Sequence, residues 1–265
     1  MPFNKVKRVI YKNNPLIRVI CELRFPRILS ISEKPPADFQ ERIRKNYPIY
    51  NVALEQQKQL VVGLNMEQSP KIIQNEQRNN YLFSSSDGVW QILLTSTFLS
   101  LSTSKYERWE DFRSHLKEPL DALIDIYSPA FFERVGIRYI DAFRRSALNI
   151  EPEVPWTELI NSFALGFLSN DEICAEVKGY SATSDIDLGN NAMARIITST
   201  GFVGNVLFED NQEISFIVDS DMFFNSKKNL DELENSLEYL HEHAGKLIRN
   251  IITDKLHFAM EPEDV

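Results

Sequence analysis

The chain has 265 residues, of which 43% are hydrophobic and 25% are charged, and its formal net charge is −9. These proportions are close to those of soluble globular proteins, so they exclude a disordered or fibrous chain. The acidic balance argues against a general nucleic-acid-binding protein, because attraction to phosphate needs a concentrated basic surface.

Neither a membrane span nor a secretory signal is indicated. No apolar run reaches the roughly 20 residues that a spanning helix needs, and the first residues lack the apolar segment of a signal peptide. Cys21 and Cys174 are the two cysteines. A single pair cannot form the framework of a disulfide scaffold, so we interpret both as reduced, buried thiols and expect a cytoplasmic location.

The charges are distributed unevenly. Residues 1–46 carry eleven lysines and arginines against four acids, so the remainder of the chain is strongly acidic. We interpret this asymmetry as attraction between the basic N-terminal part and the acidic C-terminal part, within the fold or an oligomer. The alternative is a local face for an acidic partner or RNA, but no interleaved aromatic residues support it.

The first predicted strand covers residues 15–25, PLIRVICELRF, where apolar residues alternate with Arg18, Glu22 and Arg24. Such alternation is typical of a half-buried strand. A short helix is expected over 37–47, where apolar residues recur every four positions, and a strand at the apolar run LVVGL, residues 60–64.

Residues 81–143 predict a hairpin, a helix and a returning strand. The dipeptide Asp87–Gly88 favours a tight turn between two apolar segments. Ser104 and Glu107 have the spacing of a helix start, and apolar residues then recur at intervals of three and four as far as Tyr127. RVGIRYIDAF, residues 134–143, is expected to be the strand.

A proline-rich segment at 151–156, EPEVPW, is the best candidate for a linker. After it the pattern predicts a short helix, strands near 173–182, 192–200 and 213–219, and a long C-terminal helix. We therefore expect an α+β fold with two antiparallel sheet-and-helix layers. The predicted subdomains are residues 1–148 and 149–265, which could also form one compact domain.

The final long helix carries a heptad stripe, whose members are Leu230, Leu233, Leu237, Leu240, Ala244, Leu247 and Ile251. The stripe predicts either a helix that covers the sheet of its own subunit or the seam of a homodimer, with its leucines and Ile251 as the interface. Asn229 and Glu232 resemble a capping pair. Thr253 is expected to cap a last short helix, before an acidic tail that frays.

The histidines do not form a recognisable metal site. His241 and His243 are two residues apart and lie on different helix faces, and HEHAG does not match the zinc spacing. Glu238 and His241 make one E-x-x-H, but a di-iron site would need a second copy and further glutamates. No phosphate-binding or nucleophile-elbow motif is present, so we predict no catalytic residues and no cofactor.

Two acidic pairs remain as metal candidates. Asp185 with Asp187, and Asp219 with Asp221, have the spacing that places two carboxylates on one strand face, where they could hold Mg²⁺ or Ca²⁺. The alternative interpretation places Asp185 and Asp187 in a loop, with Asp219 and Asp221 at the end of a strand.

Arg134 and Arg138 share one face of the strand 134–143, so they could bind an anion. Such arginines can equally pair with neighbouring acids on a sheet surface, for which Glu133 and Asp141 are the nearest in sequence.

Four segments carry a resemblance that spans nearly the whole chain: NPLIRVICELRF, FLSLSTSKYERWEDF, RVGIRYIDAF and LHEHAGKLIRNIITDKLHFAM. Together they resemble a sporadically distributed, uncharacterised family of prokaryotic proteins. The scattered occurrence of that family is similar to that of mobile defence or toxin–antitoxin components. The outline of an antiparallel sheet followed by a long helix is also similar to SecB-like chaperones, by fold analogy alone.

Two hypotheses about function follow. The first is a non-enzymatic component that binds a protein partner, as an antitoxin, sensor or chaperone-like member of a defence or toxin–antitoxin locus. The second is a hydrolase or nuclease that uses a divalent metal at the paired aspartates. The first is favoured, because strand and helix surfaces are abundant and catalytic groups are not evident.

Overall fold

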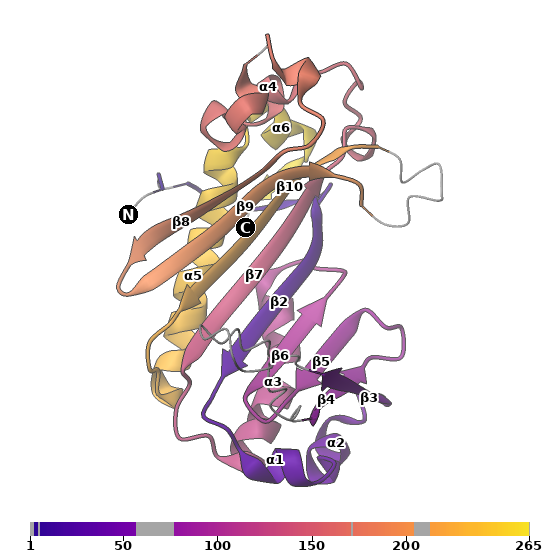
Figure 1. Cartoon of the computed structure of the whole chain (residues 1–265), viewed down its shortest axis with the longest axis vertical. Helices are drawn as coiled ribbons and strands as arrows, with labels where there is room; N and C mark the ends of the chain where they lie inside the picture. The colour runs from indigo at the N-terminus through magenta and orange to yellow at the C-terminus, as the bar shows by residue number, and fades with distance from the viewer. Residues whose placement is uncertain (1–2, 5, 57–76, 171, 204–212, 265) are drawn as a thin grey trace, which may run out of the picture.

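The structure is a computed structural model that describes residues 3–4, 6–56, 77–170, 172–203 and 213–264. Within these residues, nine antiparallel strands form one sheet in the order β3-β4-β5-β6-β2-β7-β10-β9-β8 (Figure 1). Their bounds, in the same order, are Ile49–Gln56, Gln77–Ser84, Trp90–Leu94, Phe98–Thr103, Leu16–Arg24, Arg134–Phe143, Ser215–Phe224, Ala192–Gly201 and Ser181–Gly189.

Two long helices, α3 (Trp109–Tyr127) and α5 (Leu230–Ile251), lie on one face of this sheet, behind it in Figure 1. Neither of these two helices covers the other face, which we call the open face. Shorter helices are α1 (Leu29–Glu33), α2 (Ala37–Ile43), α4 (Trp156–Leu159) and α6 (Asp254–Ala259). Turns of 3₁₀ helix lie at Ser146–Leu148, Ser162–Ala164, Gly166–Ser169 and Cys174–Glu176. The fold is α+β with a long C-terminal helix, as expected.

Both halves of the chain contribute to the same sheet. The expected strand at 134–143 is β7, and it pairs on one side with β2 and on the other with β10, which comes from the second half. The segment 149–265 therefore shares its sheet with the segment 1–148.

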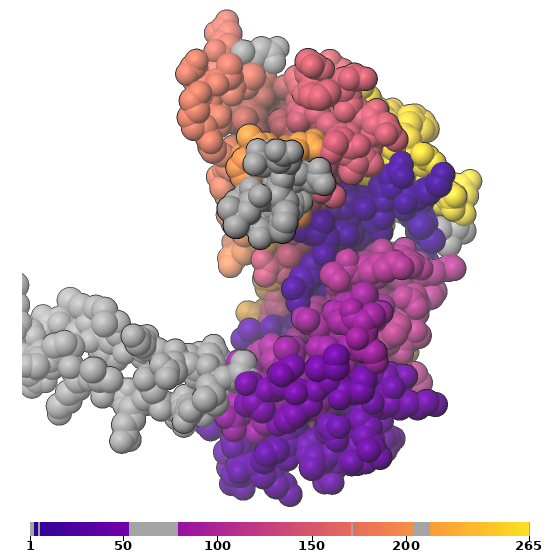
Figure 2. Space-filling view, turned by 90° about the vertical axis from the view of Figure 1, so that its right-hand side faces the viewer, coloured from indigo at the N-terminus to yellow at the C-terminus, as the bar shows by residue number. Residues whose placement is uncertain are grey.

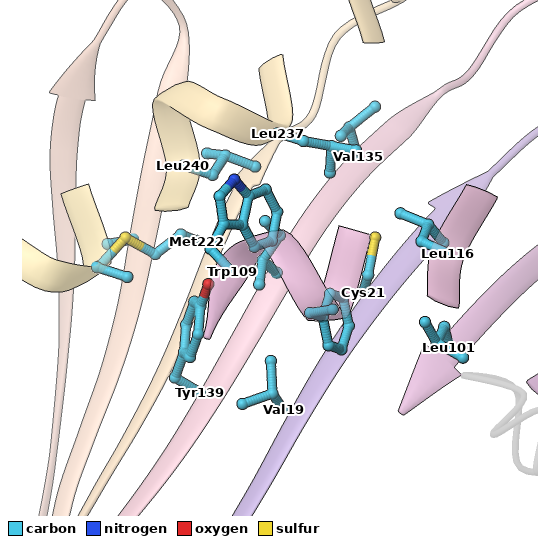
Figure 3. Packing of buried hydrophobic residues seen from close by; sticks show 14 of the residues in the cluster. Val19, Cys21, Leu101, Trp109, Leu116, Val135, Tyr139, Met222, Leu237 and Leu240 are labelled. Carbon is cyan, nitrogen blue, oxygen red and sulfur yellow. The ribbon is translucent and has the colours of Figure 1, made fainter. Parts of the chain in front are cut away.

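Alternating burial along the central strands explains why one face takes the helices. Cys21, Ile137 and Met222 lie side by side in register on β2, β7 and β10, and all three are fully buried. Figure 3 shows Cys21 and Met222 in the same buried cluster as Trp109 of α3 and Leu240 of α5. Burial raises the pKa of the Cys21 thiol to about 12, so this cysteine is an inert core residue. Cys174, which was also expected to be buried, is only partly buried, because it lies in the 3₁₀ turn Cys174–Glu176.

The heptad stripe packs against the sheet of its own chain. Its residues from Leu233 to Ile251 are buried, and the exception is Leu230, at 41% exposure. Asn229 and Glu232 form the expected capping box at the start of α5. Because these side chains already fill the core, the stripe does not offer them as a seam between two copies.

The two ends of the described chain pair with each other. β1 (Val9–Tyr11) and β11 (Pro262–Asp264) form a separate two-stranded antiparallel sheet. The expectation of a frayed acidic tail is therefore wrong. The Lys12 Nζ lies 2.8 Å from a carboxylate oxygen of Glu261, and the Lys7 Nζ lies 2.5 Å from a carboxylate oxygen of Asp264. Figure 2 shows the indigo N-terminal residues on the surface beside the yellow C-terminal ones. These two ion pairs neutralise part of the basic charge of the N-terminal region with acids of the C-terminal region.

Local expectations hold at the turn between β4 and β5 but not at the start of α3. Gly88 takes a φ of +73°, and Asp87 accepts a hydrogen bond from the Val89 amide, as a tight turn requires. The helix begins at Trp109 instead of near Ser104. The reason is that the Ser104 amide donates to the Val89 carbonyl and so extends the pairing of β6 with β5.

Other boundaries also differ from expectation. The strand expected at 173–182 begins at Ser181, because residues 174–176 form a 3₁₀ turn. Asp185 and Asp187 consequently lie on β8 and not in a loop. The strand expected at LVVGL falls outside the described residues. The helix expected after EPEVPW is shorter and breaks into 3₁₀ turns.

Candidate functional site

A cavity of about 460 Å³ lies between β1, the central sheet and α5, with the start of α3 at one end. We call it the β1 cavity. Its apolar lining includes Val9, Leu16, Phe143, Ala244, Ile248 and Met260, and its aromatic lining comprises Tyr11, Tyr106, Trp109 and Tyr139. The volume lies within the roughly 300–1,000 Å³ that is typical of small-molecule pockets.

Asp141 of β7 is the least expected residue in this lining. Its side chain is 4% exposed, and none of the described residues gives it a hydrogen bond or an ion pair. Burial, followed by the nearby negative charge of Asp219, raises the pKa of Asp141 to about 8. The carboxyl group is therefore largely protonated at neutral pH.

The alternation of β7 explains why an acid lies here. Val135, Ile137, Tyr139 and Asp141 occupy every second position and share the face that carries the helices. The suggestion that Asp141 pairs with arginines on the sheet surface is therefore wrong, because those arginines lie on the other face. The sequence did carry a signal for this residue: Asp141 is an acid at a position where the alternation of the strand calls for an apolar side chain.

His241 of α5 closes one wall of the β1 cavity. Its Nδ1 lies 3.0 Å from the Tyr139 hydroxyl, and its ring stacks on Trp109 with 4.5 Å between centroids. Burial, together with the positive charge of Arg8, lowers the pKa of His241 to about 4. The imidazole is thus neutral near pH 7, and the tyrosine can donate its proton to Nδ1.

Trp109 also connects α3 to α5 at this wall. Its indole N–H donates a 2.7 Å hydrogen bond to Glu238, three residues before His241 on α5. Both members of the E-x-x-H pair noted in the sequence, Glu238 and His241, therefore contact the Trp109 side chain. Tyr106 packs edge-on against Tyr139, with centroids 5.9 Å apart, and burial raises the pKa of both phenols.

The other charged residues in the lining all have ion-pair partners. At the N-terminal side these pairs are Lys7–Asp264, Arg8–Glu110, Arg108–Glu110 and Lys105–Glu107. On α5 they are Arg113–Glu238, Lys246–Glu242 and Arg249–Asp254. Within the described lining, Asp141 is thus the one acidic or basic group whose charge would be uncompensated.

The open face of the sheet holds the arginines proposed as an anion site. Arg134 donates to Glu22 at 2.9 Å and to both oxygens of Asp221 at 2.7 and 2.8 Å. Arg138 forms a two-bond pair with Asp219, at 2.6 and 2.5 Å. Both guanidinium groups are therefore already neutralised by neighbouring acids, and the sequence had not identified these partners.

The four aspartates proposed as metal ligands lie on the same open face but do not converge. Asp185 pairs with Arg195, and Asp187 accepts the Gly189 amide. These two lie on β8, whereas Asp219 and Asp221 lie on β10, with β9 between them. In the part of the chain that the structure describes, no group of three or more histidines, cysteines or acids is arranged to hold a metal ion.

Comparison with known proteins gives no assignment: no family model matches the chain, and no curated protein matches it significantly. Among the described helices, none is both long enough and apolar enough to cross a membrane.

Proposed function

We propose that the protein is a non-enzymatic sensor that binds a small molecule in the β1 cavity. The observation that carries this proposal is Asp141, a buried carboxyl group that faces a cavity and lacks a partner among the described residues. Burying a polar group without a hydrogen bond costs roughly 1–3 kcal/mol in proteins. A bound ligand that contacts Asp141 would offset this cost.

The remaining lining supports binding as well. Apolar and aromatic side chains from β1, β2, α3, β7 and α5 surround a few polar groups, which is the usual composition of a ligand site. The Tyr139–His241 and Trp109–Glu238 hydrogen bonds fix the orientation of two of these polar groups. The cavity wall is thus organised before any ligand arrives.

Binding is a better interpretation than catalysis. An activated nucleophile needs a general base within hydrogen-bond reach, and Asp141 has no hydroxyl, thiol or imidazole bonded to it among the described residues. His241 has a pKa near 4, so it is a weak proton acceptor at neutral pH. The metal-dependent hydrolase hypothesis receives less support still, since arginines hold three of its four aspartates.

The wider role expected from the sequence stays a prediction. This wider role comprises membership of the sporadically distributed prokaryotic family and a place in a defence or toxin–antitoxin locus. It also includes a protein partner, a homodimer and a cytoplasmic location. Of the antitoxin, sensor and chaperone-like roles, the sensor is the one that a ligand cavity supports, because a sensor must bind a signal as well as a partner.

A fragment screen by thermal shift tests the proposal. The wild-type protein should be stabilised by some members of a chemically diverse set, because a ligand that binds only the folded state raises its stability. Gly245 is the site for a blocking variant, since it lines the cavity and a Cβ there meets no atom within 4 Å. Gly245→Leu should fold and lose these shifts.

A matched control is Gly179→Leu, because Gly179 also has open space around a Cβ and does not line the β1 cavity. It should keep the shifts of the wild type. The proposal fails if no fragment stabilises the wild-type protein, or if Gly245→Leu responds to the same fragments as the wild type does.

A further inference from the structure

We propose that the ligand of the β1 cavity is an organic cation, a small amine with an apolar body whose ammonium group pairs with the Asp141 carboxylate. This inference rests on the proposed function and names the chemistry of the molecule that the cavity takes.

The charge balance of the lining is the first argument. The acidic and basic residues around the cavity neutralise one another in pairs, and Asp141 alone is left without a partner among the described residues. An anionic ligand would add a second negative charge beside this acid. A cation supplies the missing countercharge beside a buried carboxyl group, where opposite charges attract more strongly than in bulk water.

The aromatic lining is the second argument. Tyr11, Tyr106 and Tyr139 line the same cavity as Asp141 and come from β1, the segment before α3, and β7. Aromatic rings attract cations through their negative faces, and sites for ammonium ligands combine such rings with an acid. The apolar residues at positions 9, 16 and 248 would surround the uncharged body of the ligand.

The groups that face Asp141 determine how binding depends on pH. From its own sheet these are Tyr139 and Ser220, from β1 Tyr11, and from α5 His241 and Arg249, while Asp219 acts by its charge from the opposite face of the sheet. The tyrosines and His241 are neutral near pH 7, because burial shifts their pKa values away from neutrality. Asp219 and Arg249 are charged but paired with Arg138 and Asp254.

Asp141 is therefore the group that changes its charge when the cation binds. The protonated carboxyl group and the ammonium ion come together, the carboxyl O–H bond breaks, and its proton leaves to the solvent, so that a carboxylate–ammonium pair remains. Net charge is conserved, since one cation enters and one proton leaves. Affinity for the amine should consequently rise with pH up to about 8, where the carboxyl group ionises without a ligand.

Calorimetric titration tests this inference with two amines and two neutral molecules of the same shape. The amines are phenethylamine and tryptamine, and their neutral counterparts are 2-phenylethanol and tryptophol. Near pH 6.5 at least one amine should bind about tenfold or more tightly than its alcohol. Titrations in two buffers of different ionisation enthalpy should show the release of about one proton per amine bound.

The variant Asp141→Asn keeps the shape of the side chain and cannot ionise. It should weaken amine binding by about tenfold or more and leave the alcohols unchanged. The proton count uses the wild-type protein alone, so the inference can be tested even if the variant does not fold.

The inference is overturned if the alcohols bind as tightly as the amines, if amine binding releases no proton, or if none of the four molecules binds. In each of these cases the proposed function still stands when other fragments stabilise the wild type and Gly245→Leu abolishes that effect. It falls when the whole fragment set fails, or when Gly245→Leu responds to the same fragments as the wild type does.

Discussion

The Tyr139 hydroxyl lies 3.0 Å from Nδ1 of His241, and this contact joins the central strand β7 to the long helix α5 at the wall of the β1 cavity. Trp109 stacks on the same imidazole and donates its own hydrogen bond to Glu238. The elements α3, β7 and α5 therefore meet through side chains that also line the cavity. Substitutions here should separate structural roles from binding roles.

Trp109→Phe should reduce the free energy of unfolding by about 2 kcal/mol, because it removes a partly buried hydrogen bond and part of a buried ring system. Urea denaturation measures the change. Glu238→Gln keeps an oxygen acceptor for the indole N–H, so it should reduce the free energy of unfolding much less. Equal losses in the two variants would show that the charge of Glu238, and not its role as acceptor, stabilises the junction.

The stability of the protein should depend on pH through Asp141. Its pKa in the folded state is about 8, whereas an aspartate in an unfolded chain titrates near 4. Between these pH values the folded protein holds a proton that the unfolded chain has released, so the free energy of unfolding falls as the pH rises from about 4 to about 8.

Asp141→Asn removes this dependence. The variant should be more stable than the wild type by roughly 2 kcal/mol or more near pH 8, and similar to it near pH 4. Denaturation at both pH values gives the comparison. Asp185→Asn is the control, because it removes an acid on β8 that is paired with Arg195 and should not stabilise the protein at either pH. A wild-type stability that is unchanged between these pH values would contradict the prediction.

Gly136 and Arg134 should be energetically coupled. A Cβ at Gly136 would collide with the Arg134 guanidinium, which is held by Glu22 and Asp221. Gly136→Ala should therefore destabilise the wild type by about 1–3 kcal/mol, since the guanidinium must leave its partners. In an Arg134→Met background the same substitution should cost about 1 kcal/mol less. A double-mutant cycle measures this difference, and additive effects would exclude the coupling.

The pairing of the chain ends should loosen without Tyr11. Its hydroxyl lies 2.8 Å from Nδ1 of His257, and burial raises the pKa of the phenol to about 12. Tyr11→Phe should speed hydrogen exchange at the amides of Lys12 and Asn13, which donate to the carbonyls of Glu261 and Met260. Amides of β7 are the internal reference and should exchange at the wild-type rate.

Gly245→Ala should stabilise the protein. The residue lies inside α5, and the added Cβ meets no atom within 4 Å. Glycine costs about 1 kcal/mol relative to alanine within a helix, so a gain of up to this size is expected from thermal or urea denaturation. A loss of stability would show that the backbone at Gly245 does not have free space around it.

The elements with strong periodicity were predictable from the sequence. Alternation identified the strand at 134–143, and the heptad stripe with its capping pair identified α5. Both patterns arise within one continuous segment, where each residue's neighbours are known. The heptad did not distinguish a subunit core from a dimer seam, because both bury the same leucines.

The β1 cavity was not predictable in this way. Its polar groups come from β7, α5 and the segment before α3, and nothing in their local spacing brings Tyr106, Asp141 and His241 together. The partners of Arg134 and Arg138 were missed for the same reason, since pairing across strands depends on strand order. The pairing of β1 with β11 joins the two most distant parts of the described chain, and neither segment carries a strand pattern of its own.

The seam between β7 and β10 divides the sheet at the point where the two halves of the chain meet. Nine register pairs cross it, from Val135–Phe224 to Phe143–Phe216. The proline-rich segment at 151–156 is the only backbone link between those halves. Cutting the chain there should yield two fragments that fail to fold separately but reassemble when mixed, so the protein offers a natural design for a split reporter.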